Sequence, residues 1–368
     1  MIGTTLLYLL EALIPAFIFS AYYKGRGKAI FHKNLLFLLV LTILSTIIGG
    51  RYNVGKDWPE YLEFYKNIHY YFDYQHIFEE SLEPGFLMLG FVCNGLGLSS
   101  SGYFFVIAFM IYLLIYGGMK DRPFLYCWIA MFFMTQFHSI SLNIIRQAIA
   151  VAIFLYSTRY INNNNKKLLL CICAAFSFHY SSIILLIALI INKEWFNFLD
   201  RKYLVCSIFV ASIILAPILM NIVMDYLPLL TMSDKYMRNA ATADEELMTV
   251  SSGLGLIVIK VCDIALILTS DKVVRYYDDV RIKCIYRLFF VGIILSSIFG
   301  LSVMLSRLPL GLVMLRIYIL ALSCHYYFKV DRRLSILGLA LLAINLMMTI
   351  TGVMHGDGGC SPYQFKWL

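Results

Sequence analysis

Long hydrophobic runs alternate with short polar connectors along the whole chain. They lie at 3–22, 34–50, 84–99, 102–118, 123–138, 142–158, 168–191, 203–224, 253–270, 288–305, 310–328 and 334–353. Most are close to the roughly 20 residues that an α-helix needs to cross a membrane. The pattern predicts an all-α fold: a polytopic integral membrane helical bundle of about 12 spans (range 11–14), with residues 1–368 as a single membrane domain. Two longer polar segments, 51–83 and 225–252, are expected to be loops.

The composition supports a membrane protein. Hydrophobic residues make up 61% of the chain, charged residues only 14%, and the mean hydropathy is +0.77. A soluble domain carries about 25% charged residues, and disorder requires low hydrophobicity with high charge. Both classes are therefore excluded, and the net charge of +8 is interpreted as a topology signal and not as a sign of nucleic-acid binding.

The basic residues predict the orientation. Six short connectors hold 20 of the 30 Lys and Arg, whereas the long loops, the turn at 306–309 and the C-terminal tail together hold 7. Basic connectors belong on the cytoplasmic side. Both termini and both long loops, 51–83 and 225–252, are therefore expected outside.

Two hydrophobic runs do not fit simple crossings. An odd number of crossings must separate the outer loop 51–83 from the inner connector at 119, yet two runs lie between them. The run at 84–99 is short and rich in glycine, so it is predicted to be a re-entrant segment. The run at 168–191 has basic connectors at both ends, which predicts a helix broken near His179 with its apex toward the outside.

Several ionisable residues lie where the membrane makes them costly. Lys260 and Asp263, three residues apart, are expected to neutralise each other, whereas Glu11 has no evident partner. Arg146 could either snorkel toward lipid headgroups or point into the bundle as an anion ligand. His179 could satisfy loose carbonyl groups at the helix break, or accept a proton near neutral pH.

Three other arginines could also have purely structural roles. Arg51 could be an interfacial anchor, and Arg307 and Arg316 could snorkel or bond a neighbouring helix. However, the predicted topology brings many of these groups to one side of the membrane. The residues expected at the outer side are Arg51, Asp57, Glu83, Arg146, His179 and Arg307. Because arginine forks match phosphate oxygens, this set predicts an anion site for a lipid phosphate or pyrophosphate, with a base nearby.

Five motifs at these residues resemble those of the EpsG-like and Wzy-type polysaccharide polymerases, in the same order along the chain. They are Arg51 to Asp57 followed by Tyr61 and Phe64, Glu83-Pro84-Gly85-Phe86, Ile145-Arg146-Gln147 with Ala148 and Ala150, Phe178-His179-Tyr180-Ser181, and Pro362-Tyr363. The resemblance spans nearly the whole chain.

The resemblance implies an O-antigen or exopolysaccharide polymerase of the bacterial inner (cytoplasmic) membrane. Such a glycosyltransferase joins oligosaccharide repeat units carried on undecaprenyl pyrophosphate at the periplasmic face, among membrane lipids and with a separate chain-length regulator as partner. Pyrophosphate binding would then fall to Arg51, Arg146, Arg307 and Arg316. The catalytic candidates are His179, Glu83 and Asp57.

Neither a cofactor nor a metal is expected, since no D-x-D motif lies on the outer side. Two other classes stay open. A lipid-linked oligosaccharide flippase or other transporter would also need a basic cavity, but no repeated halves are evident. A membrane acyltransferase acting on a glycan would also use a histidine as base.

Overall fold

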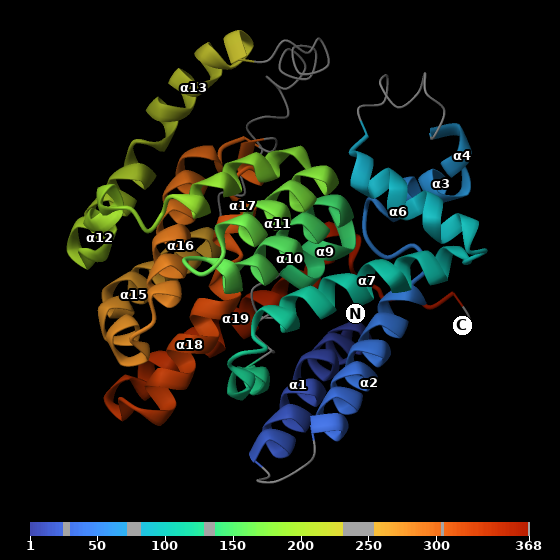
Figure 1. Cartoon of the computed structure of the whole chain (residues 1–368), viewed down its shortest axis with the longest axis horizontal. Helices are drawn as coiled ribbons and strands as arrows, with labels where there is room; N and C mark the ends of the chain where they lie inside the picture. The colour runs from blue at the N-terminus through green and yellow to red at the C-terminus, as the bar shows by residue number, and fades with distance from the viewer. Residues whose placement is uncertain (25–29, 72–81, 129–136, 231–253, 303–304, 367–368) are drawn as a thin grey trace. The chain divides into compact units, whose positions relative to one another are not determined.

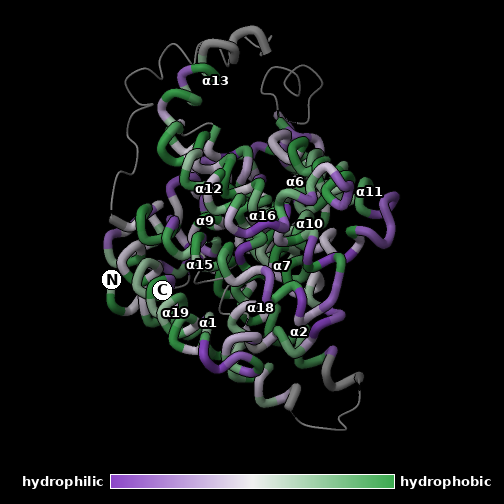
Figure 2. Tube along the Cα trace, turned by 90° about the vertical axis from the view of Figure 1, so that its left-hand side faces the viewer, coloured by the Kyte–Doolittle hydropathy of each residue, from purple (hydrophilic) through white to green (hydrophobic). Residues whose placement is uncertain are grey.

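A computed structural model describes residues 1–24, 30–71, 82–128, 137–230, 254–302 and 305–366. Within these ranges the protein is helical and has no strand, only an isolated antiparallel bridge between Arg51 and Phe365 (Figure 1). Hydrophobic residues run along most of the helices, as the hydropathy colouring of Figure 2 shows. The predicted all-α class is therefore confirmed for the described part of the chain.

The chain divides into two compact units. Unit 1 comprises Met1–Ile183 and Leu320–Leu368, and unit 2 comprises Ile184–Ile319. The helices of unit 1 are α1 (Ile2–Lys24), α2 (Ile30–Gly49), α3 (Trp58–Lys66), α4 (Ile68–Tyr71), α6 (Pro84–Gly95), α7 (Ser100–Gly118), η1 (Pro123–Trp128), α9 (Phe137–Asn143), α10 (Ile145–Ser157), η2 (Thr158–Tyr160), α11 (Asn165–Phe178), η6 (Arg332–Leu334), α19 (Ser335–His355) and η7 (Asp357–Gly359).

Helix α10 forms the centre of unit 1. Each residue from Gln147 to Leu155 is buried, and the helix packs against α7 on one side and α11 on another. A helix that is hydrophobic around most of its circumference is expected in such a central position. Helix α7 packs in turn against α2, where a Cβ at Gly49 would lie only 2.8 Å from the Cβ of Phe105. This close approach requires glycine.

Unit 2 is built around α16. Its helices are η4 (Glu194–Asp200), α12 (Lys202–Ile214), α13 (Ala216–Leu230), α15 (Leu254–Tyr277), α16 (Val280–Phe299), η5 (Leu305–Arg307) and α17 (Leu310–Val313). Two helices cross the boundary between the units: η3 (Tyr180–Leu189) and α18 (Arg316–Lys329). On α16, the buried Arg287 donates hydrogen bonds to Asp200, Asn197 and the Ile191 carbonyl, so the charge is fully partnered.

The described residues contain five helices that are long and apolar enough to cross a membrane, or up to seven if each of two bent helix pairs is one span. This supports a multi-pass membrane protein but not the predicted number of about 12 spans. Part of the run at 123–138 and most of the loop at 225–252 lie outside the described residues. The single-domain organisation and the external position of the loops stay predictions.

The two unusual runs are irregular in the structure. The run at 84–99 contains only the 12-residue helix α6, which at 1.5 Å per residue is too short to cross the hydrocarbon core. Its re-entrant path stays a prediction. The predicted break near His179 is confirmed: α11 ends at Phe178, and His179 has an extended backbone (φ −161°, ψ 122°) before the 3-10 helix η3.

One break was not predicted. The run at 142–158 was expected as one span, but Ile144 separates α9 from α10 with φ −84° and ψ 61°. Glu11 on α1, which the sequence left unexplained, lies 3.3 Å from His138 on α9, with both side chains buried.

Candidate functional site

The carboxylate of Glu83 joins two residues that are distant in sequence. Its Oε2 accepts a hydrogen bond from Nη1 of Arg146 at 2.5 Å, and its Oε1 lies 2.7 Å from Nδ1 of His179. An ionised carboxylate can only accept, so Nδ1 of His179 is the donor. Glu83, Arg146 and His179 are hereafter called the Glu83 cluster.

Local backbone features bring these three residues together. Glu83 has an extended backbone and directly precedes Pro84, the first residue of α6. A Cβ at Gly85 would lie 2.5 Å from Oγ of Ser177, so only glycine lets the start of α6 approach the end of α11 this closely. His179 caps that end of α11, and its N–H donates to the Ala175 carbonyl.

Arg146 enters the cluster from the first turn of α10. Because α9 ends at Asn143 and α10 begins at Ile145, after the break at Ile144, Arg146 is the second residue of α10. The Arg146 charge also acts on Tyr61 of α3: burial raises the pKa of the Tyr61 hydroxyl, and the guanidinium opposes that rise. Next to Arg146, Nε2 of Gln147 donates to Oγ of Ser181 at 3.3 Å. The α10 and η3 segments are thereby joined beside the cluster.

The electrostatics keep Glu83 ionised. Burial alone would raise the pKa of the Glu83 carboxyl, but the hydrogen bond from His179 and the charge of Arg146 outweigh burial and hold the pKa below its usual value. Such a carboxylate is a weak base. Its side chain is only 4% exposed, whereas those of Arg146 and His179 are 33% and 20% exposed. The cluster therefore presents a guanidinium and an imidazole to a ligand, with the carboxylate behind them.

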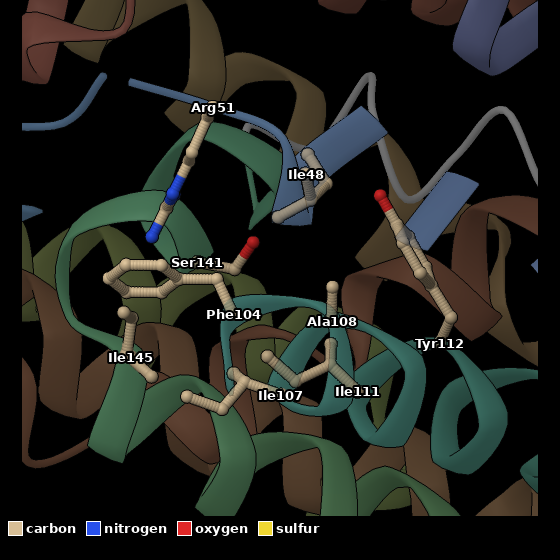
Figure 3. A pocket seen from close by; sticks show the side chains of 9 residues that line it. All are labelled: Ile48, Arg51, Phe104, Ile107, Ala108, Ile111, Tyr112, Ser141 and Ile145. Carbon is tan, nitrogen blue, oxygen red and sulfur yellow. The ribbon is translucent and has the colours of Figure 1, made fainter. Parts of the chain in front are cut away.

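Arg51 does not join the Glu83 cluster. Its guanidinium is buried, lies 4.9 Å from the ring centroid of Phe104, and points toward a small cavity (Figure 3). Asp57 is at the start of α3, and none of the ion pairs among the described residues joins it to Arg51. Arg51 and Asp57 therefore form no ion pair in this structure. A catalytic role for Asp57 stays a prediction.

Arg307 and Arg316 belong to unit 2. Arg316 binds the carboxylate of Asp263 with two hydrogen bonds, Nε to Oδ1 at 3.1 Å and Nη2 to Oδ2 at 2.7 Å. Asp263 was expected to pair with Lys260, but Nζ of Lys260 instead donates to Oγ of Ser297 at 3.2 Å. Asp263 pairs with Arg316 and not with Lys260 because the planar guanidinium can donate to both oxygens of the Asp263 carboxylate at once. Since this fork is already engaged, the structure favours a structural role for Arg316, and pyrophosphate binding by Arg307 or Arg316 stays a prediction.

The Asp263–Arg316 pair can be tested by stability. We expect Arg316→Met to lower the free energy of unfolding by about 3–5 kcal/mol, because the buried carboxylate of Asp263 loses its partner. The double variant Arg316→Met/Asp263→Leu should recover most of that loss, as measured by thermal unfolding in detergent micelles. A stable double variant that produces no polymer would contradict the structural role and return Arg316 to ligand binding.

Fold and site together define a multi-pass helical membrane protein in which a buried carboxylate holds an arginine and a histidine in place. Residues 34–365 match the sequence model of the EpsG family. The chain therefore belongs to the EpsG family, as its motifs indicated, and this membership points to a polysaccharide polymerase type of function. No curated protein and no solved structure is significantly similar to the chain.

Proposed function

We propose that this protein is a polymerase that joins undecaprenyl-pyrophosphate-linked oligosaccharide repeat units into O-antigen or exopolysaccharide, at the periplasmic face of the bacterial inner membrane. The observation that carries the proposal is the contact of Glu83 with both Arg146 and His179. A fixed cation beside an oriented imidazole suits glycosyl transfer from a pyrophosphate, which needs anion stabilisation and a proton acceptor.

The three side chains would divide the reaction as follows. The glycosyl C1–O bond to the lipid pyrophosphate breaks, and a new bond forms between C1 and the acceptor hydroxyl oxygen of the next repeat unit. The hydroxyl proton passes to Nε2 of His179, because Glu83 holds the Nδ1–H. Arg146 stabilises the charge that develops on the leaving pyrophosphate, which departs as undecaprenyl pyrophosphate.

In this scheme Glu83 orients the histidine and is not itself the base. Its ionised state and its hydrogen bond to Nδ1 fix the tautomer that presents Nε2 to the acceptor, as in other base–carboxylate pairs. The Arg146 guanidinium contacts Glu83 through one donor and also interacts with the Tyr61 hydroxyl, which leaves further donors of its five for phosphate oxygens.

The role of Arg146 is the first test. We expect Arg146→Ala to reduce polymer formation on the order of 10²–10³-fold, as when one donor to a transition-state anion is removed. Arg146→Lys should recover only part of this loss, because an ammonium keeps the charge but lacks the planar fork. Polymer would be measured as long-chain glycan made by a deletion strain carrying each variant, at matched protein level.

Arg275→Ala is the matched control, since the Arg275 side chain is 77% exposed and, among the residues that the structure describes, bonds only to Asp271 on its own helix. This variant should produce normal polymer. Near-normal polymer in Arg146→Ala would show that Arg146 snorkels or stabilises the fold, and would remove it from the reaction.

The glycan phenotype of the deletion strain separates the polymerase from the alternatives. Loss of a polymerase should leave a surface glycan with a single repeat unit. Loss of a flippase should leave none, and loss of an acyltransferase should leave long chains that lack an acyl group. Either of the last two results would overturn the proposed reaction.

A further inference from the structure

The C-terminal segment of unit 1 covers the loop that carries Arg51. After α19 ends at His355, residues 356–366 run back along residues 47–57, and this segment is hereafter called the C-terminal strap. Its hydrogen bonds to the loop are Tyr52 N to Gln364 O (2.9 Å), Lys366 N to Gly50 O (2.8 Å), Gly55 N to Gly359 O (2.9 Å), Lys56 N to Gly358 O (3.0 Å), and Tyr363 Oη to Ile47 O (2.6 Å). The first two flank the bridge between Arg51 and Phe365.

Arg51 lies beneath this strap without a counter-charge. Its side chain is 2% exposed, and Nε and Nη1 are buried without a hydrogen-bond partner. No acidic group among the described residues forms an ion pair with it. Buried charges are normally paired because the loss of hydration is costly. An arginine held in this way can bind an anion strongly once one reaches it.

The space beside the guanidinium is too small for that anion in the present conformation. The cavity holds about 10 Å³, roughly the room that one water molecule needs. Besides Arg51, it is lined by mostly apolar side chains of packed helices, including Ile48, Phe104 and Ile145, and by Ser141 (Figure 3). A phosphate group can therefore approach Arg51 only if a segment next to it moves.

Among the segments next to Arg51, the C-terminal strap can move most readily: its Phe365 pairs with Arg51 across the bridge, and its Cys360 and Tyr363 lie near the guanidinium. It is mostly non-helical, and it is held by four backbone hydrogen bonds to the loop together with side-chain hydrogen bonds, which include Tyr8 Oη to the Cys360 carbonyl and Tyr363 N to Oγ1 of Thr4, both at 2.8 Å. Its glycines at 356, 358 and 359 all have positive φ, between 63° and 74°. Glycine adopts such conformations without steric cost, so these positions can act as hinges.

From this geometry we infer that Arg51 is an anion-binding residue in addition to Arg146, and that the C-terminal strap covers it in the present conformation. Movement of the strap away from Arg51 would admit a pyrophosphate group to the Arg51 guanidinium. The inference rests on the proposed function for the identity of the anion as a lipid pyrophosphate. It adds to that function a substrate-binding step that uncovers Arg51.

Asn143 connects this step to the Glu83 cluster. Its Oδ1 accepts the Lys56 N–H at 2.6 Å, and its Nδ2 lies 3.6 Å from Sγ of Cys360 in the strap. Asn143 is the last residue of α9, three positions before Arg146. The strap, the Arg51 loop and the start of α10 therefore meet at one side chain, so a movement of the strap changes the support of Arg146.

Cys360 provides a native reporter of the strap. Its thiol is buried, and burial raises its pKa to about 11, so it should react slowly with maleimide while the strap is closed. We would replace the other eight cysteines and measure the labelling rate of the full-length protein in micelles. Inorganic pyrophosphate should raise this rate at least tenfold.

Two controls make the labelling result specific. A protein that retains only Cys173, which is exposed, should label at the same rate with and without pyrophosphate. In the Arg51→Gln variant, Cys360 should stay protected and should no longer respond to pyrophosphate. An unresponsive Cys360 in the protein with Arg51, an equal response in Arg51→Gln, or a Cys360 already reactive in that variant would each overturn the inference.

A reversible lock tests whether the strap must open. Tyr52 and Gln364 are neighbours across the bridge and are both exposed, so Tyr52→Cys/Gln364→Cys can form a disulfide that leaves Arg51 in place. In a background without native cysteines, oxidation should abolish polymer formation and dithiothreitol should restore it. Each single cysteine variant should be unaffected.

Full activity of the cross-linked protein would contradict the opening of the strap. These outcomes are distinct from a failure of the proposed function. If the protein makes no polymer in any form, the response of Cys360 to pyrophosphate still tests the anion site. If polymer forms while Cys360 never responds, only the strap inference fails.

Discussion

Replacing Glu83 with glutamine should reduce polymerisation on the order of 10³–10⁴-fold, because the carboxylate holds both Arg146 and His179. A glutamine can accept from only one of the two donors with its single oxygen, and its amide would face the other donor. Nδ1 of His179 or Nη1 of Arg146 would lose its acceptor. The analogous carboxylate-to-amide change beside the histidine of serine proteases costs about 10⁴ in turnover.

The measurement is the initial rate of chain extension in proteoliposomes with lipid-linked repeat units. Because the pKa of Glu83 lies below its usual value, the native carboxylate is ionised from about pH 5 to 8. Glu63→Gln, on the exposed face of α3, is the matched control and should be fully active. A rate within about threefold of the wild-type rate in Glu83→Gln would show that the Glu83 cluster is not the reaction centre.

His179→Gln should lower turnover by about 10²–10⁴-fold, the usual contribution of a positioned general base. Glutamine can still form a hydrogen bond with Glu83, but it cannot take the proton of the acceptor hydroxyl. The loss should appear in kcat with little change in KM, because a base acts mainly in the transition state. Both constants would be obtained from the same proteoliposome assay, with the acceptor concentration varied.

His69→Gln provides the control for this substitution. His69 lies on α4, is exposed, and contacts Asn94 at 3.1 Å, so its replacement should leave both constants unchanged. Normal kcat in His179→Gln would make His179 a structural residue of the helix break. The search for the base would then turn to Asp57, the remaining carboxylate among the candidates.

The protein class could be predicted from the sequence because it depends on local properties. Apolar runs near the length of a membrane span, together with few charged residues, leave a helical membrane bundle as the only stable solution. The break at His179 was also foreseeable, from a run too long for one span with basic residues at both ends. The sequence does not predict the break at Ile144, because the polar residues beside it, Asn143 and Arg146, are compatible with a continuous helix and no Gly or Pro marks a helix end there.

The site was predicted as a set of residues but not as an arrangement. The sequence predicts Glu83, Arg146 and His179 as members of one anion site at the outer side, but not which of them are in contact. Their assembly depends on the contact of Gly85 with Ser177, which brings the start of α6 to the end of α11. The hydrogen bonds of Glu83 join it to Arg146, 63 positions away in the sequence, and to His179, 96 positions away. No local sequence pattern specifies contacts over such separations.

By itself, the sequence determined the all-α membrane class, the helix break and the chemical types of the site residues, since hydrophobic length and charge act over short stretches of chain. Only the tertiary structure decided which charges meet. It paired Asp263 with Arg316 in place of Lys260, placed Arg51 under the C-terminal strap apart from Asp57, and made Glu83 the common partner of Arg146 and His179. The physical reason is that burial makes an unpaired charge costly, so packing between distant segments selects the partner of each.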